Sequence, residues 1–193
     1  MNKEQIKILL NECNAELEVE LLQAFLEVEA GGKGFDPKTG KIMIQFEPHV
    51  FARETGLERS EGNKHIWDEN KIDVQSKEWI AFNDAFLIDP DNAMESTSIG
   101  IPQIMGFHWK RLGFASVNAM WDSFKESEGN QVRGLIKFIQ TDTRLYTAFK
   151  MKDFYKMAYY YNGSKFKELA IKEKREPYDV SLQKTYIKYK GLM

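Results

Sequence analysis

The sequence predicts an α+β fold that is mostly helical and carries one small β-hairpin near its start. From residue 77 onward, apolar side chains recur with the period of amphipathic helices. Between residues 42 and 47, apolar and polar residues instead alternate directly after a turn sequence, as they do in a half-buried strand. A short early hairpin followed by a long run of helices is typical of an α+β domain.

The size and charge of the chain narrow its function. A chain of 193 residues is long enough for a sizeable core, and we expect one domain over residues 1–193. A net charge of −2 does not fit a protein that binds nucleic acid or anionic lipid. Cys13 is the only cysteine, which excludes an internal disulfide and a thiolate metal site. His49, His65 and His108 lack the spacing of zinc ligands, so we expect no metal site.

The beginning of the chain bears on where the protein is made. The first residues, "MNKEQIKILL", have no long apolar run and no small-residue cleavage site, so we expect no signal peptide. No stretch is long and apolar enough to span a membrane. The prediction is a monomer made in the cytoplasm, without stable membrane association.

Two helices are predicted before the first pair of glycines. In "KEQIKILLNECNAEL", one helical stripe carries Ile6, Leu9, Leu10 and Cys13, and the cysteine is most simply a small core residue. A second helix runs from Glu18 to Ala30 and stops at Gly31-Gly32.

The hairpin comes next. Residues 36–40 have turn chemistry, and the strand after them places Ile42, Ile44 and Phe46 on one side and Met43, Gln45 and Glu47 on the other. This strand is expected to end at Pro48. Residues 55–76 are polar and irregular, apart from residues 65–67, and are interpreted as a loop.

The rest of the chain is predicted to be helical. Helices are expected in residues 77–88, within 89–97, and in 116–127, 130–140, 143–150, 152–162 and 179–190. Side chains suited to capping them are Asp89 or Asp91, Ser116 and Asn130.

Two glutamates near the end of the second helix have different surroundings. On the helical period of about 3.6 residues, Glu29 shares a face with apolar side chains, whereas Glu27 lies on the polar face. Glu27 is therefore most simply a solvated charge. Partial burial and the negative end of the helix dipole both disfavour ionisation of Glu29, so we expect its pKa to be raised. A protonated glutamate can act as a general acid, although a structural salt bridge would explain Glu29 equally well.

A second carboxyl group is commonly needed for glycoside hydrolysis. Glu47 is the nearest candidate, because it lies on the polar face of the strand that follows the glycine pair. From the alternation alone, a charge on an edge strand is the favoured explanation of Glu47.

Four segments, in this order, resemble the phage and bacterial N-acetylmuramidase family. They read "LEVEAGGKGF", "KIMIQFEPHVF", "ESTSIGIPQIMGFHWKRLGFAS" and "AYYYNGSKF". The family belongs to the lysozyme-like superfamily, with kinship to goose-type lysozymes and lytic transglycosylases. Because the match covers nearly the whole chain, it implies a lysozyme-like fold.

The resemblance also implies roles for the acidic residues. The family's Glu-Ser-Gly-Gly motif puts its catalytic acid on Glu29, with Ala30 in place of the serine. Its Phe-Glu-Arg-His segment puts a second acidic residue on Glu47, with Pro48 in place of the arginine. Glu95, a third carboxylate, is counted among the substrate-binding residues and competes with Glu47 for the second role.

The other two segments imply contacts to the substrate. The family pattern Ser-x-Gly-x-x-Gln-x-Met-Gly falls on Ser98, Gly100 and Gln103, where a plain helix-entry turn is the alternative. Glycine permits close approach of a sugar, and the glutamine amide can bind an N-acetyl group. Tyr161 and Asn162 match the segment that lines the lysozyme-like cleft, where an aromatic helix stripe is the alternative. We expect Gln103 and Asn162 to bind substrate rather than hold the fold.

The function implied by the resemblance is a peptidoglycan hydrolase that needs no cofactor. It would cleave the β-1,4 bond between N-acetylmuramic acid and N-acetylglucosamine in the glycan strands. A lytic transglycosylase acting on the same bond is the runner-up, and a non-catalytic wall-binding module is the alternative from another class. A phage endolysin that causes host lysis fits, acting on the wall after release or dedicated export; a bacterial effector or a prophage remnant would fit too.

Overall fold

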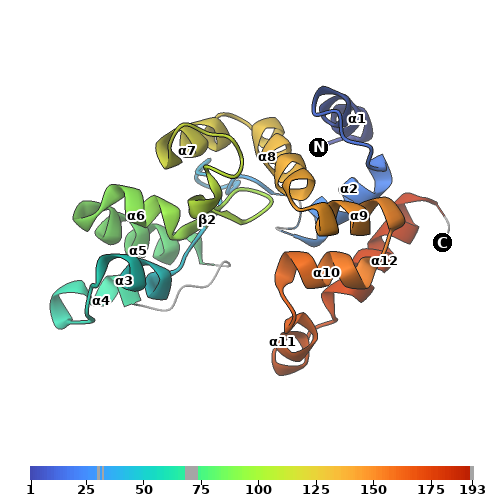
Figure 1. Ribbon diagram of the computed structural model, residues 1–193. Coiled ribbons are helices and arrows are strands. Elements are labelled where there is room, and N and C mark those ends of the chain that lie inside the picture. The colour runs from blue at the N-terminus through green and yellow to red at the C-terminus, as the bar shows by residue number, and fades with distance from the viewer. Residues whose placement is uncertain (30, 32, 68–73, 192–193) are drawn as a thin grey trace. The chain divides into compact units, whose positions relative to one another are not determined.

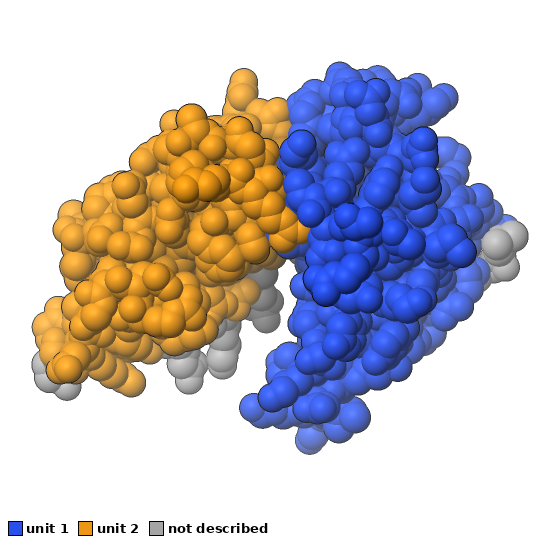
Figure 2. Space-filling view, viewed as in Figure 1, with its two compact units in different colours: residues 1–32, 132–193 blue, residues 33–131 orange. Residues whose placement is uncertain are grey.

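The computed structural model describes residues 1–29, 31, 33–67 and 74–191. The protein is mostly helical and contains a three-stranded antiparallel sheet, which confirms the predicted fold class (Figure 1). The chain forms two compact units, coloured separately in Figure 2: unit 1 holds residues 1–32 and 132–193, and unit 2 holds residues 33–131. In the described part of the chain, no helix is long and apolar enough to cross a membrane.

Unit 1 is built from helices around α2. Its elements are α1 (Lys3–Glu12), α2 (Val19–Val28), the later part of α8 (Glu128–Thr141), α9 (Thr143–Met151), α10 (Phe154–Asn162), α11 (Phe166–Lys172) and α12 (Tyr178–Tyr189). Both α1 and α12 pack on α2. The apolar stripe predicted for the first helix is buried, with Ile6, Leu9 and Leu10 each less than 5% exposed, whereas Cys13 is only half-buried and ends α1.

Phe25 on α2 joins three other helices of unit 1. Its ring is fully buried and contacts those of Phe149 on α9, Tyr161 on α10 and Tyr178 on α12, with centroids 5.2, 4.7 and 6.0 Å away. Burial of one such side chain contributes about 1.5–3 kcal/mol, and edge-on aromatic pairs add to it. This cluster therefore holds the end of α2 against α10 and α12.

Local capping signals start several helices where the sequence predicts. The side chain of Asp89 caps α6 (Pro90–Glu95), and that of Ser116 caps α7 (Val117–Glu126). The prediction for Asn130 is wrong, because α8 already begins at Glu128. The hydroxyl of Ser127 accepts the Asn130 N–H at 3.1 Å, so the serine supplies the cap that the asparagine was expected to supply.

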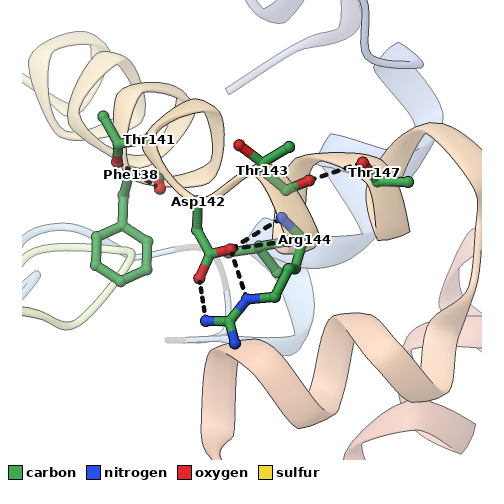
Figure 3. A network of polar contacts seen from close by, with 7 residues as sticks. Phe138, Thr141, Asp142, Thr143, Arg144 and Thr147 are labelled. Atoms are coloured by element: carbon green, nitrogen blue, oxygen red, sulfur yellow. Dashed lines mark hydrogen bonds and ion pairs between the residues drawn. The ribbon is translucent and has the colours of Figure 1, made fainter.

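The start of α9 is a polar network within unit 1 (Figure 3). Asp142 precedes the helix, and its Oδ1 accepts the N–H groups of Arg144 and Leu145 at 2.9 and 3.3 Å. The same carboxylate binds the Arg144 guanidinium, with Nη2 at 3.2 Å from Oδ2. Capping and pairing both favour the charged form, so the pKa of Asp142 is lowered, first by Arg144.

Unit 2 contains the sheet and the helices around it. Its elements are β1 (Ile44–Phe46), α3 (Pro48–Thr55), the 3₁₀ turn Glu61–Asn63, α4 (Lys64–Trp67), α5 (Gln75–Ile88), α6, β2 (Thr97–Ile99), β3 (Ile104–Met105), the 3₁₀ turn Gly106–His108, α7 and the start of α8. The strand order is β1-β2-β3, with Ile44 opposite Ile99 and Ile99 opposite Ile104. The predicted inward side of the strand is confirmed, since Ile42, Ile44 and Phe46 are at most 3% exposed.

The predicted hairpin needs correction in its pairing. The turn at residues 36–40 forms, and a single bridge joins Phe35 to Ile42. However, the strand partner of β1 is β2, which lies about fifty residues later and was interpreted only as part of a binding turn. Pairing between distant strands leaves no local signature, so the sequence did not reveal it.

Three helical segments were missed. Pro48 was expected only to end a strand, but it is also the first residue of α3, where its missing N–H costs no hydrogen bond. The interval 55–76 contains α4 and the start of α5 as well as loop; its residues 68–73 lie outside the described ones. The short helix α11 was not predicted.

Candidate active site

Glu29 lies directly after α2 and ends it. Its N–H still bonds to the Phe25 carbonyl at 3.0 Å, but its ψ of −120° leaves the helical path. Gly31 then adopts a φ of +60°, which favours glycine, and donates its N–H to the Glu29 carbonyl at 2.7 Å. The helical-face prediction is confirmed, because Leu22, Phe25 and Leu26 are buried, and the Glu29 side chain is half-buried beside them.

Glu29 is held by a tyrosine from the last helix. The Tyr178 hydroxyl donates a hydrogen bond to Glu29 Oε1. Tyr178 is 8% exposed, and its hydroxyl is in turn hydrogen-bonded by the Asn162 side chain. Glu29, Tyr178 and Asn162 thus form a chain of polar contacts that joins the end of α2 to α10 and α12.

The surroundings of Glu29 favour its protonated form. Burial raises its pKa to about 7, against the opposing effects of the Tyr178 hydrogen bond and the Arg175 charge. Among the described residues, Glu29 forms no ion pair, so a structural salt bridge does not account for it. Tyr161 is close enough to feel the Glu29 charge, which together with burial raises the pKa of that tyrosine well above its ordinary value.

Glu27 differs from the sequence interpretation. It is not a fully solvated charge, because it accepts hydrogen bonds from the Tyr189 hydroxyl at 2.6 Å and from Lys188 Nζ at 2.9 Å. These contacts lower the pKa of Glu27, with Tyr189 the largest cause. Glu27 therefore stays ionised and ties α2 to α12, whereas Glu29, two residues later, retains a proton to much higher pH.

Tyr178 and Arg175 were missed by sequence reasoning. A local signal was present, since Tyr178, Leu182, Tyr186 and Tyr189 follow a helical period along α12. That pattern identifies a face that packs on another helix. It does not identify the glutamates that the tyrosine hydroxyls contact, because those belong to α2 and its flanking residues.

Glu47 lies in unit 2, between β1 and α3. It occupies the N-cap position of α3, yet its side chain makes no capping hydrogen bond. The side chain is 29% exposed, and its Oε2 lies 3.4 Å from His49 Nδ1. Burial raises the pKa of Glu47, while the nearby His49 opposes this. Glu47 is thus a partly buried carboxyl group rather than a freely solvated charge.

Glu95, the competing carboxylate, is committed to a structural contact. Its Oε1 accepts the Trp109 indole N–H at 2.8 Å, which joins the end of α6 to the segment after β3. Among the described residues, the Glu47 carboxylate has only the longer contact to His49, at 3.4 Å, so the geometry favours Glu47 for the second role.

The segment from Ser98 to Gly106 is a β-hairpin turn rather than a helix-entry turn. Gln103 has a φ of +47°, and its amide closes the turn. Its Nε2 donates to the Gly100 carbonyl at 2.8 Å, and its Oε1 accepts the Ser98 hydroxyl at 3.1 Å. The amide therefore holds the backbone, contrary to the expectation that Gln103 has no part in the fold.

Position 100 has no room for a side chain, so packing requires a glycine there. Its φ is +71°, and an added Cβ would lie 2.7 Å from the side chain of Gln131. Gln131 is fully buried; it accepts the Ile101 N–H and donates to the Phe124 carbonyl, both at 2.9 Å. The close approach that this glycine permits is to Gln131, another buried residue that sequence reasoning missed.

The predicted site residues fall into two groups. Glu29, Tyr161 and Asn162 belong to unit 1, and Glu47, Glu95, Ser98, Gly100 and Gln103 belong to unit 2. Within the described ranges, no three histidine, cysteine or acidic side chains come together as a metal site requires. The pairing of Glu29 with Glu47 stays a prediction.

A separate pocket of about 290 Å³ lies in unit 1, around the start of α9 and the exposed side of α10. Arg144 and Lys156 line it, and both are paired with aspartates of their own helix starts, Asp142 and Asp153. None of the residues predicted for catalysis lines this pocket.

Comparison with known proteins identifies the family. The family model for N-acetylmuramidase matches residues 18–190. A crystal structure of the Burkholderia AP3 phage endolysin matches with a TM-score of 0.80 and 28% sequence identity, over 100% of this chain and 71% of that chain. No curated protein matches. Since the family model spans most of the chain and the fold agrees with a member of the endolysins, the protein belongs to the N-acetylmuramidase family of peptidoglycan hydrolases.

Proposed function

We propose that this protein hydrolyses the β-1,4 bond between N-acetylmuramic acid and N-acetylglucosamine in peptidoglycan. The observation that carries the proposal is Glu29, a half-buried carboxyl group with a pKa raised to about 7 and a hydrogen bond from Tyr178. A carboxyl group that keeps its proton near neutral pH is suited to protonate a glycosidic oxygen.

Glu29 acts as the general acid in this proposal. Its proton passes to the oxygen of the leaving sugar as the bond breaks, and the resulting carboxylate is stabilised by the Tyr178 hydroxyl and the Arg175 charge. The same two groups oppose the rise in pKa, so they keep the acid strong enough to give up its proton. The surroundings of Glu29 therefore serve both the protonated and the ionised form.

Glu47 is proposed as the second carboxylate. It would act in its ionised form, either by activating water or by stabilising the positive charge that develops on the sugar ring. His49 beside it supports the ionised form, in opposition to burial. Its looser contact, to His49 at 3.4 Å, favours it over Glu95, which accepts the Trp109 indole N–H at 2.8 Å.

Substrate contacts are proposed for Tyr161, Asn162 and the turn of Ser98, Gly100 and Gln103. Asn162 is exposed and can read an acetamido group while it bonds to Tyr178. In the turn, the side chains already bond to one another. Contacts from the turn would therefore come mainly from its backbone and from the second amide hydrogen of Gln103.

Product analysis tests the proposal. Purified peptidoglycan is digested with the protein, and the fragments are identified by mass spectrometry with and without prior borohydride reduction. Hydrolysis gives reducible N-acetylmuramic acid ends. Anhydro ends that resist reduction would show a lytic transglycosylase instead, and wall binding without any fragments would show a non-catalytic module.

The setting that fits this activity is phage lysis. The protein is proposed to be made in the host cytoplasm and to act as a monomer on the cell wall, and its similarity to a phage endolysin supports the phage setting. We propose that both units together form one catalytic domain over residues 1–193. Expression in the cytoplasm with and without a pore-forming membrane protein tests this, since lysis should require the pore.

A further inference from the structure

Glu78 on α5 is a fully buried acid that the mechanism above does not use. It is 0% exposed, and one of its oxygens, Oε2, accepts the Phe46 N–H at 2.8 Å. The other oxygen, Oε1, is buried and has no hydrogen-bond partner among the described residues. An unpaired buried carboxylate oxygen is costly, so this group requires an explanation.

Glu78 lies against the edge strand β1 and binds its backbone. β1 is an edge strand, and side chains of α5 cover the backbone groups on its outer side. Gln75 donates to the Ile44 carbonyl at 2.8 Å and accepts the Ile44 N–H at 3.0 Å. Glu78, one helical turn later, accepts the next outward N–H, that of Phe46, which is the residue directly before Glu47.

Covering the edge does not by itself call for an acid. A glutamine at position 78 would accept the Phe46 N–H equally well, as Gln75 does for Ile44, and would bury no charge. What distinguishes the acid is the proton that it can bind on Oε1. Burial raises the pKa of Glu78 to about 7, against the opposing hydrogen bond from the Phe46 N–H, and the negative charge of its neighbour Glu47 adds to this rise.

Among the described residues, the other charged side chains on the helices that pack on α5 are exposed or have partners of their own. Lys64 and His65 on α4 and Asp91 on α6 are exposed, and Glu95 on α6 bonds to Trp109. His49 lies beside Glu47, with its Nδ1 3.4 Å from Glu47 Oε2. Glu47 thus has two titratable neighbours in unit 2, His49 and the buried Glu78.

We propose that Glu78 is a positioning residue for Glu47: it fixes the Phe46 backbone through one oxygen and holds a proton on the other, so that the negative charge of the two carboxyl groups resides on Glu47. This deepens the function proposed above and rests on it for the role of Glu47. Ionising both of two neighbouring acids would place like charges close together, so one of them keeps its proton. The more buried acid keeps it, because burial disfavours the charged form. Glu47 is then ionised while Glu78 is still neutral.

The carboxyl pair is tested first without any substrate. The side-chain carboxyl signals of the full-length protein, labelled with ¹³C, are followed by NMR across the pH range, and each signal is assigned with Glu→Gln variants, including Glu29→Gln. Glu78 should titrate near 7. In Glu47→Gln this midpoint should fall, because the neighbouring negative charge is gone; in Glu78→Gln, Glu47 should still titrate. An ordinary midpoint for Glu78, or one that ignores Glu47→Gln, overturns the proposal even if the protein cleaves peptidoglycan.

Stability against pH gives a second readout. Because the folded-state pKa is raised from 4.5 to about 7, the stability that neutral Glu78 provides is full below 4.5 and is lost as the pH rises through 7. The melting temperature should therefore decline less over this window in Glu78→Gln than in the wild type. Gln75→Ala is the matched control, since it removes the two hydrogen bonds to the Ile44 backbone on the same edge and no titrating group. It should lower the melting temperature by a similar amount at every pH.

Activity then separates positioning from a purely structural role. Glu78→Gln should keep kcat at about pH 6 within a few-fold. Above pH 7 its kcat should fall less steeply than that of the wild type, because Glu29 and Glu78 both ionise there in the wild type and only Glu29 does so in the variant. Glu78→Ala, which leaves the Phe46 N–H without its acceptor, should lower kcat about tenfold or more with little change in KM. If Glu78→Gln and the wild type have the same pH profile, Glu78 is only an edge cover. If no wall is cleaved by any variant, the proposed function fails while the NMR titration still decides on the pair.

Discussion

The hydroxyl of Tyr178 donates a hydrogen bond to Glu29 across a sequence separation of 149 residues. This contact joins the first residue of α12 to the residue that ends α2, and the two helices pack on each other. It places a neutral donor, rather than a cation, against the acid. The carboxyl group is thus oriented without the full charge stabilisation that an ion pair would bring, which is consistent with its raised pKa.

The first prediction concerns the acid itself. Glu29→Gln keeps the size of the side chain but cannot transfer a proton, so activity on cell walls should fall by about 10²–10⁴-fold. Glu27→Gln is the matched control on the same helix. It loses contacts to Lys188 and Tyr189 that are partly exposed, at a cost of about 1 kcal/mol, and should keep activity within a few-fold. Turbidity loss and thermal melting of both variants check this; an active Glu29→Gln beside an inactive Glu27→Gln would reverse the assignment.

The second prediction is the pH dependence that follows from Glu29. Its folded-state pKa of about 7 lies above the ordinary value of 4.5, so neutral Glu29 stabilises the fold fully below 4.5 and this contribution is lost as the pH rises through 7. Activity should fall over the same alkaline limb, because the acid must carry its proton. On the acidic side, activity should fall as Glu47 is protonated, at a pH above the ordinary glutamate range. Initial rates measured across pH, at constant ionic strength, would refute this if the alkaline limb is missing.

The third prediction concerns Tyr178. Its hydrogen bond favours the ionised form of Glu29, so Tyr178→Phe should raise the pKa of Glu29 and move the alkaline limb to higher pH. Loss of orientation should also lower kcat, by about tenfold. Tyr189→Phe removes the equivalent hydroxyl from Glu27 and serves as the control, with the alkaline limb unmoved. A Tyr178→Phe variant that loses stability but keeps the wild-type pH profile would make Tyr178 a packing residue only.

The fourth prediction separates Gln103 from Asn162. Gln103→Ala removes two hydrogen bonds inside the β2–β3 turn and should cost about 1–3 kcal/mol of stability. Asn162→Ala changes an exposed residue at the end of α10, and should lower activity while the melting temperature stays within about 2 °C. Denaturant unfolding and wall clearing are measured for both. Equal stability of the two variants would mean that the turn does not depend on the Gln103 amide.

The fifth prediction isolates the clash at Gly100. Gly100→Ala and Gly113→Ala both put a side chain at a positive φ, +71° and +86°, so both carry a conformational cost of about 1 kcal/mol. Only at Gly100 does the new Cβ meet another residue, Gln131, at 2.7 Å. Gly100→Ala should therefore be the less stable variant by about 1–3 kcal/mol. A similar loss in both, measured by urea unfolding, would show that Gln131 moves aside without cost.

What the sequence by itself determined about this protein is local. The helical period placed α5, α7 and α12 to within a few residues, and short-range capping at Asp89 and Ser116 marked where helices begin. The same period placed Glu29 on the apolar side of α2, so its raised pKa was predictable. Each of these features depends on side chains within one or two helical turns of one another, which is the range that a sequence pattern reports.

Only the tertiary structure decided the partners. The contacts that matter most join residues that are distant in the chain: Tyr178 with Glu29, Glu78 with Phe46, and β1 with β2. The sequence also did not reveal that Gln103 closes a turn or that Gly100 packs on Gln131, because an amide that closes a turn and one that faces a sugar have the same local pattern. Such contacts depend on how packed elements meet. Burial raises the pKa values of Glu29 and Glu78 to about 7, and it exists only once distant elements of the chain exclude water from these carboxyl groups.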